Sequence, residues 1–164
     1  MNYREGGQKK LKIFTLGVLF AISVALLLHL VVGKVFYINR TDSAPKGIYM
    51  VSLNQNLHYG DYVIVSLPVD VPSLQVPKGF LLLKQVRGFP GDVYRVSEGA
   101  MEIHGKAYAI YRQEGLPQLK AGERAVAEDE MILLNERELS FDSRYLGPIG
   151  KNQIVTKVEL LVAD

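Results

Sequence analysis

The distribution of apolar and polar positions divides the chain into three parts. Residues 1–12 are polar, with basic side chains in excess of the single acid, Glu5. Residues 13–33 are almost entirely apolar, and about 20 helical residues span roughly 30 Å, the thickness of the hydrocarbon core of a bilayer. From residue 34 onward, short apolar runs alternate with turn residues. This pattern predicts a basic cytoplasmic segment over 1–12, a transmembrane helix over 13–33 and a β-rich extracytoplasmic domain over 34–164.

The apolar segment is interpreted as an uncleaved anchor, and the alternative is a cleaved signal peptide. The segment is longer than the roughly 7–15 apolar residues of a signal-peptide core, and no small-x-small cleavage site follows in residues 33–37. Basic residues before an apolar segment remain in the cytoplasm. We therefore expect a single-pass protein whose domain lies across the membrane from its N-terminus.

The rest of the chain has the pattern of an antiparallel β domain. Strand-like runs bounded by Gly and Pro occur at 48–51, 61–67, 80–87, 131–134 and 154–162. Glycines within 93–111 predict hairpins, the polar stretch 113–130 predicts a surface excursion, and helical periodicity is not evident after residue 34. The expected fold class is mainly β, with one N-terminal transmembrane helix.

Two residues are candidates for nucleophilic chemistry. Ser43 lies two residues before Pro45, where the chain cannot continue as helix, so the serine is presented on irregular backbone. In the strand predicted over 80–87, alternation places Lys84 on the same face as Leu82 and Val86. A lysine on an apolar face is under pressure to lose its proton, as a general base must. The alternatives are an ordinary loop serine and an edge lysine whose ammonium reaches water.

The polar loop at 135–149 supplies further candidates. In an extended segment, Asp142 and Arg144 lie on the same side as Ser140, and a surface ion pair is the default expectation.

Composition narrows the chemistry further. The chain has no cysteine, which excludes disulfides, thiol nucleophiles and thiolate metal sites. A net charge of +2 without a basic stripe gives no reason to expect nucleic-acid binding. No metal or cofactor is expected, because His104 has no partner at metal-site spacing.

Four short motifs behind an anchor resemble the bacterial type I signal peptidase family, serine proteases that use a lysine as base. The motifs are Ser43-Ala-Pro45, Gly60-Asp-Tyr-Val-Ile-Val65, Lys84-Gln-Val-Arg-Gly-Phe-Pro-Gly-Asp92 and Ser140-Phe-Asp-Ser-Arg-Tyr-Leu-Gly-Pro148. The serine box Asn-x-Thr-x-Ser-x-Pro-x-Gly-x-Tyr, from Asn39 to Tyr49, is similar to the TraF-type branch of conjugative transfer systems. Leu133-Leu134 departs from the Gly-Asp that often precedes the last box, so the local turn there stays open.

The resemblance implies a role for each candidate residue. Ser43 would be the nucleophile and Lys84 the base. The supporting and substrate-binding residues would be Thr41 as the oxyanion-hole hydroxyl, Ser140 at the lysine amine, Asp142 and Arg144 as a supporting pair, and Leu82 and Leu83 near the pocket for a small residue before the cut.

The implied function is a membrane-anchored serine endopeptidase that matures an exported precursor, in this branch a conjugative pilin. The cut would remove a signal peptide or a C-terminal tail, and hydrolysis and cyclisation both stay open. The expected partners are a membrane-inserted, pilin-like precursor and the lipid bilayer, without nucleic acid. The expected location is the bacterial inner (cytoplasmic) membrane, with the catalytic domain on the periplasmic side.

Two other functions stay open, namely a general type I leader peptidase and a catalytically silent, membrane-tethered β module of pilus or secretion assembly. Self-cleaving repressors share a Ser-Lys site, but an apolar anchor stands here in place of their DNA-binding domain.

Overall fold

The structure, a computed structural model, describes the backbone of residues 3–164 and the side chains from residue 12 on, except those of His29 and Val31. The predicted basic segment 1–12 therefore lies almost wholly outside the described side chains. The chain divides into two units, residues 1–37 and 38–164, which are described separately.

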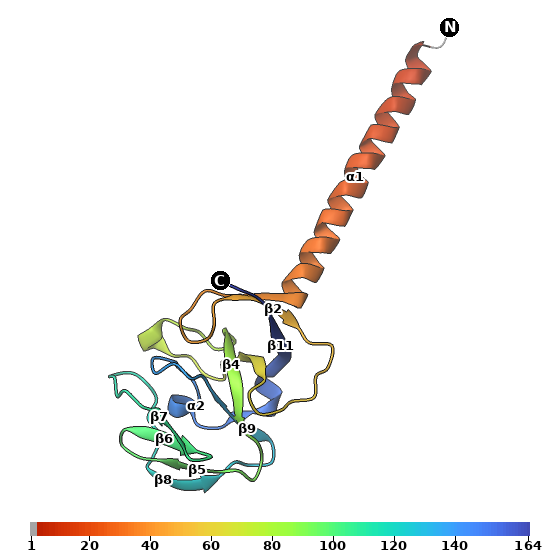
Figure 1. Cartoon of the computed structure of the whole chain (residues 1–164). Helices are drawn as coiled ribbons and strands as arrows, with labels where there is room; N and C mark the ends of the chain where they lie inside the picture. The colour runs from red at the N-terminus through yellow and green to blue at the C-terminus, as the bar shows by residue number, and fades with distance from the viewer. Residues whose placement is uncertain (1–2) are drawn as a thin grey trace. The chain divides into compact units, whose positions relative to one another are not determined.

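The first unit consists of one long helix, α1 (Tyr3–Val35), drawn in red and orange in Figure 1, and the first two residues of strand β1 (Phe36–Asn39). The stretch Lys12–Val35 has a mean hydropathy of 2.5 and is long and apolar enough to cross a membrane. Its described side chains are largely exposed, so no protein core accounts for their apolar character. The helix continues to Val35 rather than ending at residue 33.

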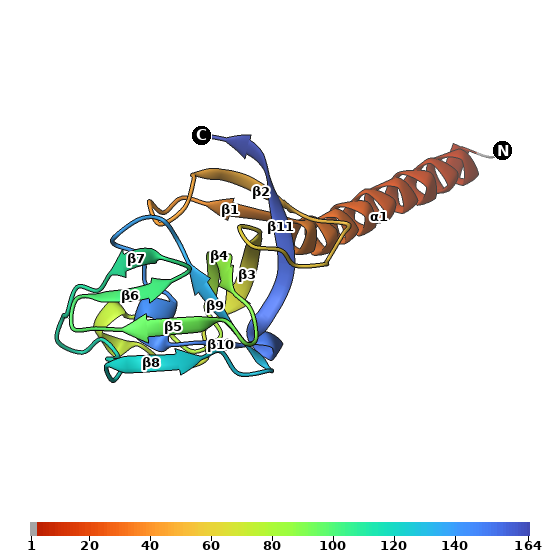
Figure 2. The same cartoon turned by 60° about the horizontal axis from the view of Figure 1, so that its bottom comes forward.

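The second unit is built from antiparallel strands in two sheets (Figures 1 and 2). The larger sheet has the order β1 (Phe36–Asn39), β2 (Gly47–Val51), β11 (Ile154–Ala163), β3 (Tyr62–Ser66), β4 (Leu81–Gly88), β9 (Glu130–Leu134), β10 (Ile149–Gly150). The smaller sheet has the order β7 (Lys106–Ala109), β6 (Ala100–Ile103), β5 (Val93–Val96), β8 (Gly122–Ala125). Short helical turns, η1 (Pro72–Leu74) and η2 (Lys151–Gln153), connect strands.

The mainly β, antiparallel fold class is confirmed, and so are the strands predicted from runs bounded by turn residues. The last strand, β11, does not close an edge of the sheet. It lies between β2, which it pairs through residues 158–163, and β3, which it pairs through residues 154–158.

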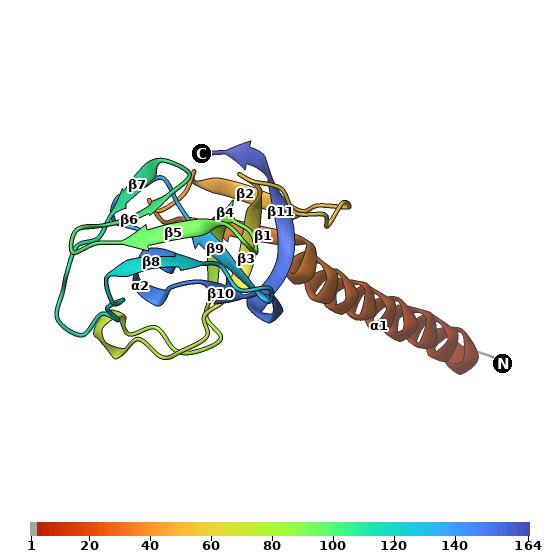
Figure 3. The same cartoon turned by 90° about the horizontal axis from the view of Figure 1, so that it is seen from below.

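Strand β9 connects two hydrophobic clusters. Ile132 and Leu134 pack with residues of the smaller sheet, whereas Met131 and Leu133 pack with residues of β3 and β4. Figure 3 shows β9 between β4 and the smaller sheet. The run Met131-Ile-Leu-Leu134 is apolar throughout because both faces of this strand are buried.

Gly88, at the end of β4, lies where the larger sheet packs against Ile103 of the smaller sheet. A Cβ at this position would lie 2.7 Å from Cδ1 of Ile103 and 2.9 Å from Cβ of Ile132. The missing side chain therefore permits close packing of the smaller sheet on β9.

The structure contains two elements that the sequence did not predict. The polar stretch 113–130 contains β8, which pairs with β5 and completes the smaller sheet. The segment after Ser140 is not extended, because α2 (Ser143–Leu146) forms a short helix capped by Asp142, whose side chain accepts a hydrogen bond from the Arg144 backbone N–H. A single helical turn is too short to give a periodic signal in the sequence.

Candidate active site

The loop between β1 and β2 carries Ser43 on irregular backbone, as its spacing to Pro45 predicts. Asn39 organises this loop. Its side-chain amide donates to the carbonyls of Thr41, Ala44 and Pro45 at 3.0–3.1 Å. Its Oδ1 accepts from the backbone N–H and the hydroxyl of Thr41, at 3.1 and 2.7 Å. One side chain thus replaces the regular backbone pairing that a turn cannot supply.

The hydroxyls of Thr41 and Ser43 lie 2.9 Å apart. A hydroxyl carries one proton, and that of Thr41 is donated to Asn39, so Ser43 is the donor in this pair. The structure therefore brings Thr41 and Ser43 together, with the Ser43 proton directed at Thr41.

Tyr49 holds the other end of the loop from β2. Its hydroxyl donates to the Pro45 carbonyl at 2.8 Å, and its ring contacts Tyr62 edge to face at a centroid distance of 5.5 Å. The residue is fully buried, and this burial raises the pKa of Tyr49 to about 12. The phenol therefore remains a neutral donor to the loop at physiological pH.

Lys84 on β4 is buried, with 3% of its surface exposed, on the same face as Val86. Its Nζ donates to the Ser140 hydroxyl at 3.0 Å. Burial lowers the pKa of Lys84 to about 8; the Asp142 carboxylate opposes this shift and Arg144 adds to it. Lys84 is therefore a buried lysine and not an edge lysine whose ammonium reaches water. The contact with Ser140 that the resemblance implied is present.

A second buried lysine shows how different Lys84 is. Lys157 on β11 has 7% of its surface exposed and forms an ion pair with Asp61 at 2.7 Å. It also donates to the Asn56 carbonyl at 3.1 Å. Lys84, in contrast, forms no ion pair with any described side chain, and its described partner is a neutral hydroxyl. A buried ammonium without a carboxylate is poorly stabilised, so the environment of Lys84 favours the neutral amine.

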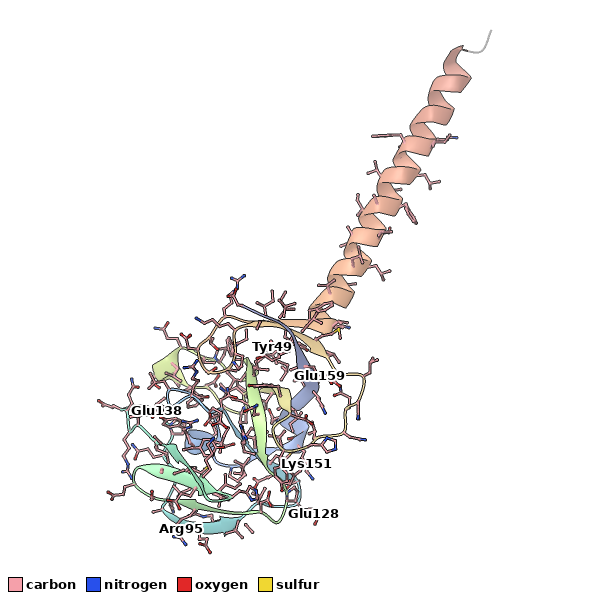
Figure 4. The ribbon with its side chains drawn as sticks, viewed as in Figure 1. Tyr49, Arg95, Glu128, Glu138, Lys151 and Glu159 are labelled. Carbon is pink, nitrogen blue, oxygen red and sulfur yellow. The ribbon has the colours of Figure 1, made fainter. Side chains whose placement is uncertain are left out.

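Asp142 and Arg144 form a buried, bidentate ion pair rather than the surface pair expected from the sequence. The distances are 2.8 Å from Nε to Oδ1 and 3.1 Å from Nη2 to Oδ2, and the side chains are 0% and 1% exposed. Arg144 also donates to the carbonyls of Asn135 at 2.7 Å and of Glu138, labelled in Figure 4, at 2.8 Å. The pair thereby holds the segment that leads into Ser140.

Asn135 is a site residue that was not assigned a role from the sequence. Its side-chain amide donates to the Leu83 carbonyl at 3.0 Å and accepts from the Gln85 N–H at 3.2 Å, the two neighbours of Lys84. Its own N–H donates to Asp142 at 3.1 Å. Asn135 therefore ties the backbone around Lys84 to the buried ion pair. The only signal in the sequence is an asparagine directly after a buried strand.

A cavity of about 260 Å³ lies beside the serine loop. It is lined by Ser43, Ala44, Pro45, Tyr62, Asn135, Glu136 and Arg137. Leu82 and Leu83 are half-buried on β4 and are not among its lining residues, so their role in substrate binding stays a prediction. No described hydrogen bond joins Ser43 to Lys84. Among the described side chains, no cluster of His, Asp and Glu could hold a metal ion.

A family model described as signal peptidase, peptidase S26, matches residues 11–163. Two proteins of Escherichia coli named plasmid transfer protein TraF are similar to the chain. One is 26% identical over 141 residues, covering 74% of this chain and 79% of that protein. The other is 25% identical over 145 residues, covering 76% and 81%.

Two further relatives carry the name signal peptidase I. A Synechocystis protein named probable signal peptidase I-2 is 30% identical over 74 residues, which cover 44% of this chain and 34% of that protein. A solved signal peptidase I structure from Enterococcus faecalis V583 has a TM-score of 0.42 and 17% identity, covering 66% of this chain and 100% of that chain. Because the family match spans nearly the whole chain, from within α1 to the end of β11, this protein belongs to the S26 family of signal peptidases.

Proposed function

We propose that this protein is a membrane-anchored serine endopeptidase in which Ser43 is the nucleophile and Lys84 the general base. The environment of Lys84 is the observation that carries the proposal. Its amine is buried, donates to the Ser140 hydroxyl and has no described carboxylate partner. An amine in this setting holds its proton less tightly than an exposed lysine, so an appreciable fraction is neutral near physiological pH and can accept a proton from a serine hydroxyl.

The reaction begins when the Ser43 hydroxyl leaves Thr41 and approaches Lys84, since no described hydrogen bond joins the two in the resting site. The Ser43 oxygen attacks the scissile carbonyl while Lys84 takes its proton. The C–N bond then breaks, and the Lys84 ammonium returns the proton to the leaving amine. A second nucleophile releases the acyl group from Ser43 by the same proton transfers in reverse order.

The tetrahedral intermediate carries a negative oxygen that needs donors. The Ser43 backbone N–H and the Thr41 hydroxyl are our candidates, and loss of one such donor typically costs about 10²–10³ in rate. The Thr41 proton is donated to Asn39 in the resting site, so it must turn toward the oxyanion during the reaction. Ser140 keeps its hydrogen bond to Lys84 and fixes the direction of the amine.

We expect the cleavage rate to rise with pH and to level off above about 8. The neutral amine is the working form, and burial lowers the pKa of Lys84 to about 8, so the working fraction falls tenfold for each pH unit below that value. Single-turnover cleavage measured between pH 6 and 10 checks this, since product release then cannot hide the chemical step.

A direct titration of Lys84 separates the base assignment from other pH effects. In protein labelled with ¹³C-lysine, one side-chain Cε resonance is expected to titrate near 8 and to be absent in Lys84→Met. The reference pKa of a lysine side chain in water is about 10.4. A Lys84 resonance that titrates at this reference value, together with a rate independent of pH between 6 and 10, would contradict the assignment of Lys84 as base.

The substrate we propose is a membrane-inserted, pilin-like precursor of a conjugative transfer system. Two relatives that are similar to this chain over 74% and 76% of its length are named plasmid transfer proteins. This supports a pilin-like precursor over the substrates of a general leader peptidase. The apolar helix supports a membrane location, and Ser43 follows Val35 by eight residues, at most about 30 Å of extended chain. Cleavage therefore takes place close to the lipid surface.

The orientation we propose places residues 1–12 in the cytoplasm and the domain in the periplasm, because basic residues precede the apolar segment. Alkaline phosphatase fused after Asp164 is expected to be active. Green fluorescent protein fused at the same position, and exported by the same route, is expected to be non-fluorescent. The reverse pair of results would place the domain in the cytoplasm and contradict the orientation.

A further inference from the structure

Arg137 presents an unpaired guanidinium in the cavity beside Ser43. The side chain is exposed, and no described residue forms a hydrogen bond or an ion pair with it. It nevertheless lies near enough to Asp42 to help lower the pKa of that carboxyl, after the larger effect of Lys46. The positive charge is therefore close to the nucleophile and free to take a partner.

The other charges around this cavity already have partners. Glu136, which also lines it, pairs with both Lys106 and Arg87. Asp42 pairs with Lys46 at 2.8 Å. Arg137 is thus the lining charge that remains available, and the cavity offers a cation rather than an anion to an incoming chain.

The backbone on both sides of Arg137 is fixed. The Asn135 carbonyl accepts from Arg144 at 2.7 Å and the Glu138 carbonyl accepts from the same guanidinium at 2.8 Å. Because Arg144 is itself buried against Asp142, Arg137 extends from a segment held at both ends. A charged side chain that extends from a fixed backbone segment loses less conformational entropy on binding a ligand than one on a mobile loop.

We infer that Arg137 binds a carboxylate of the substrate next to the scissile bond, an inference that rests on the proposed peptidase function. A guanidinium matches a carboxylate with two parallel hydrogen bonds, which gives both attraction and a fixed orientation. The carboxylate has two sources, an Asp or Glu side chain near the cut, or the α-carboxylate of a short C-terminal tail. Leader-peptide cleavage requires the first source, since a leader is followed by the whole mature protein.

The test uses the full-length protein in detergent micelles and a proteome-derived peptide library with free C-termini, read by mass spectrometry. A side-chain carboxylate gives enrichment of Asp and Glu at one fixed position relative to the cut. An α-carboxylate gives instead a fixed number of residues between the cut and the C-terminus. Synthetic pairs of a cleaved peptide, Glu against Gln or free acid against C-terminal amide, then measure the preference.

Arg137→Gln is expected to lower kcat/KM about tenfold for the peptide with the carboxylate, and to leave its neutral counterpart unchanged. Arg137→Glu is expected to reverse the preference, so that a Lys peptide is cut faster than a Glu peptide. The control is Arg95→Gln on β5, which removes the same charge at the far end of the domain from Tyr49 (Figure 4) and is expected to change neither rate.

The outcomes separate the inference from the function on which it rests. Cleavage that persists in Ser43→Ala would overturn the peptidase function itself. Cleavage that depends on Ser43, but is equal for acid and neutral peptides and unaffected by Arg137→Gln, would overturn only the role of Arg137. An equal loss with Arg95→Gln would mean a general charge effect and would also overturn that role.

Discussion

Ser43→Ala and Lys84→Met are each expected to reduce precursor cleavage by about 10⁴-fold or more, because nucleophile and base form one proton-transfer unit. The double variant is expected to be no worse than either single variant, since removing one member already disables the other. Lys84→Arg is expected to fail as well, because a guanidinium does not deprotonate at accessible pH. The measurement is mass spectrometry of a candidate pilin precursor co-expressed with each variant.

The fold is expected to survive these changes. The pKa of Lys84 is lowered from its ordinary value of 10.5 to about 8 in the native state, so the unfolded chain binds the proton more tightly. Native stability therefore rises as the pH increases from about 8 toward 10.5, and below 8 the full cost of the buried ammonium is present. Lys84→Met removes that cost at neutral pH, so an inactive variant with an unchanged or higher unfolding midpoint is expected.

The mass of the product also tells which nucleophile attacks the acyl group on Ser43. Water gives a product with a free carboxylate, whereas the substrate's own N-terminal amine gives a cyclic product lighter by one water. A tethered, well-oriented amine reaches an effective concentration of about 10⁵–10⁸ M, so the cyclic product is favoured wherever the two ends of the substrate meet.

Full processing of the precursor by the Ser43→Ala variant would contradict the catalytic assignment and would favour a catalytically silent module.

Arg144→Met is expected to destabilise the domain by about 3–5 kcal/mol, because it leaves the Asp142 carboxylate buried without its partner. The carbonyls of Asn135 and Glu138 lose their donor in the same variant. Urea unfolding of the full-length protein in micelles, followed by tyrosine fluorescence since the chain has no tryptophan, measures the change.

Two comparisons test whether the destabilisation in Arg144→Met comes from the unpaired Asp142 carboxylate. The double variant Asp142→Leu with Arg144→Met is expected to lose less than the sum of the single variants, because no uncompensated charge remains. The exposed pair of Arg95 and Glu123, broken by Arg95→Gln, is expected to cost less than about 1 kcal/mol. A loss below 1 kcal/mol in Arg144→Met would mean that water reaches Asp142 and that the pair is not the support of the Ser140 segment.

The same ion pair bears on the chemistry of Lys84. The Asp142 carboxylate raises the pKa of this lysine and Arg144 lowers it, with burial as the dominant cause of the lowering. Arg144 therefore offsets a carboxylate that would otherwise keep Lys84 charged. The fraction of the Arg144→Met variant that remains folded is expected to show its rise in cleavage rate at higher pH than the wild type.

Local patterns in the sequence were enough to predict most of the fold. Apolar length predicted α1, and short strand-like runs bounded by turn residues predicted β2, β3, β4, β9 and β11, because these signals depend only on neighbours along the chain. Alternation also placed Lys84 on the face of Val86, and Pro45 placed Ser43 on irregular backbone. The polar strand β8 was missed because its residues are exposed and gain their order from pairing with β5.

Alternation could not decide whether Lys84 is a buried base or an exposed edge lysine. It shows on which face of the strand the side chain lies, but not whether other residues cover that face. The cover comes from Ser140, 56 residues away, and from the buried pair that follows it. Asp142 and Arg144 looked like surface charges because burial of an ion pair leaves no mark on spacing. The role of Asn135 likewise depends on its hydrogen bond to β4, and the role proposed for Arg137 depends on the cavity that it shares with the serine loop. The sequence by itself determined the elements and the residue types available for chemistry, since both are local. Only the tertiary structure decided which charges are buried, paired or left free, because solvent exclusion is set by segments distant in the chain.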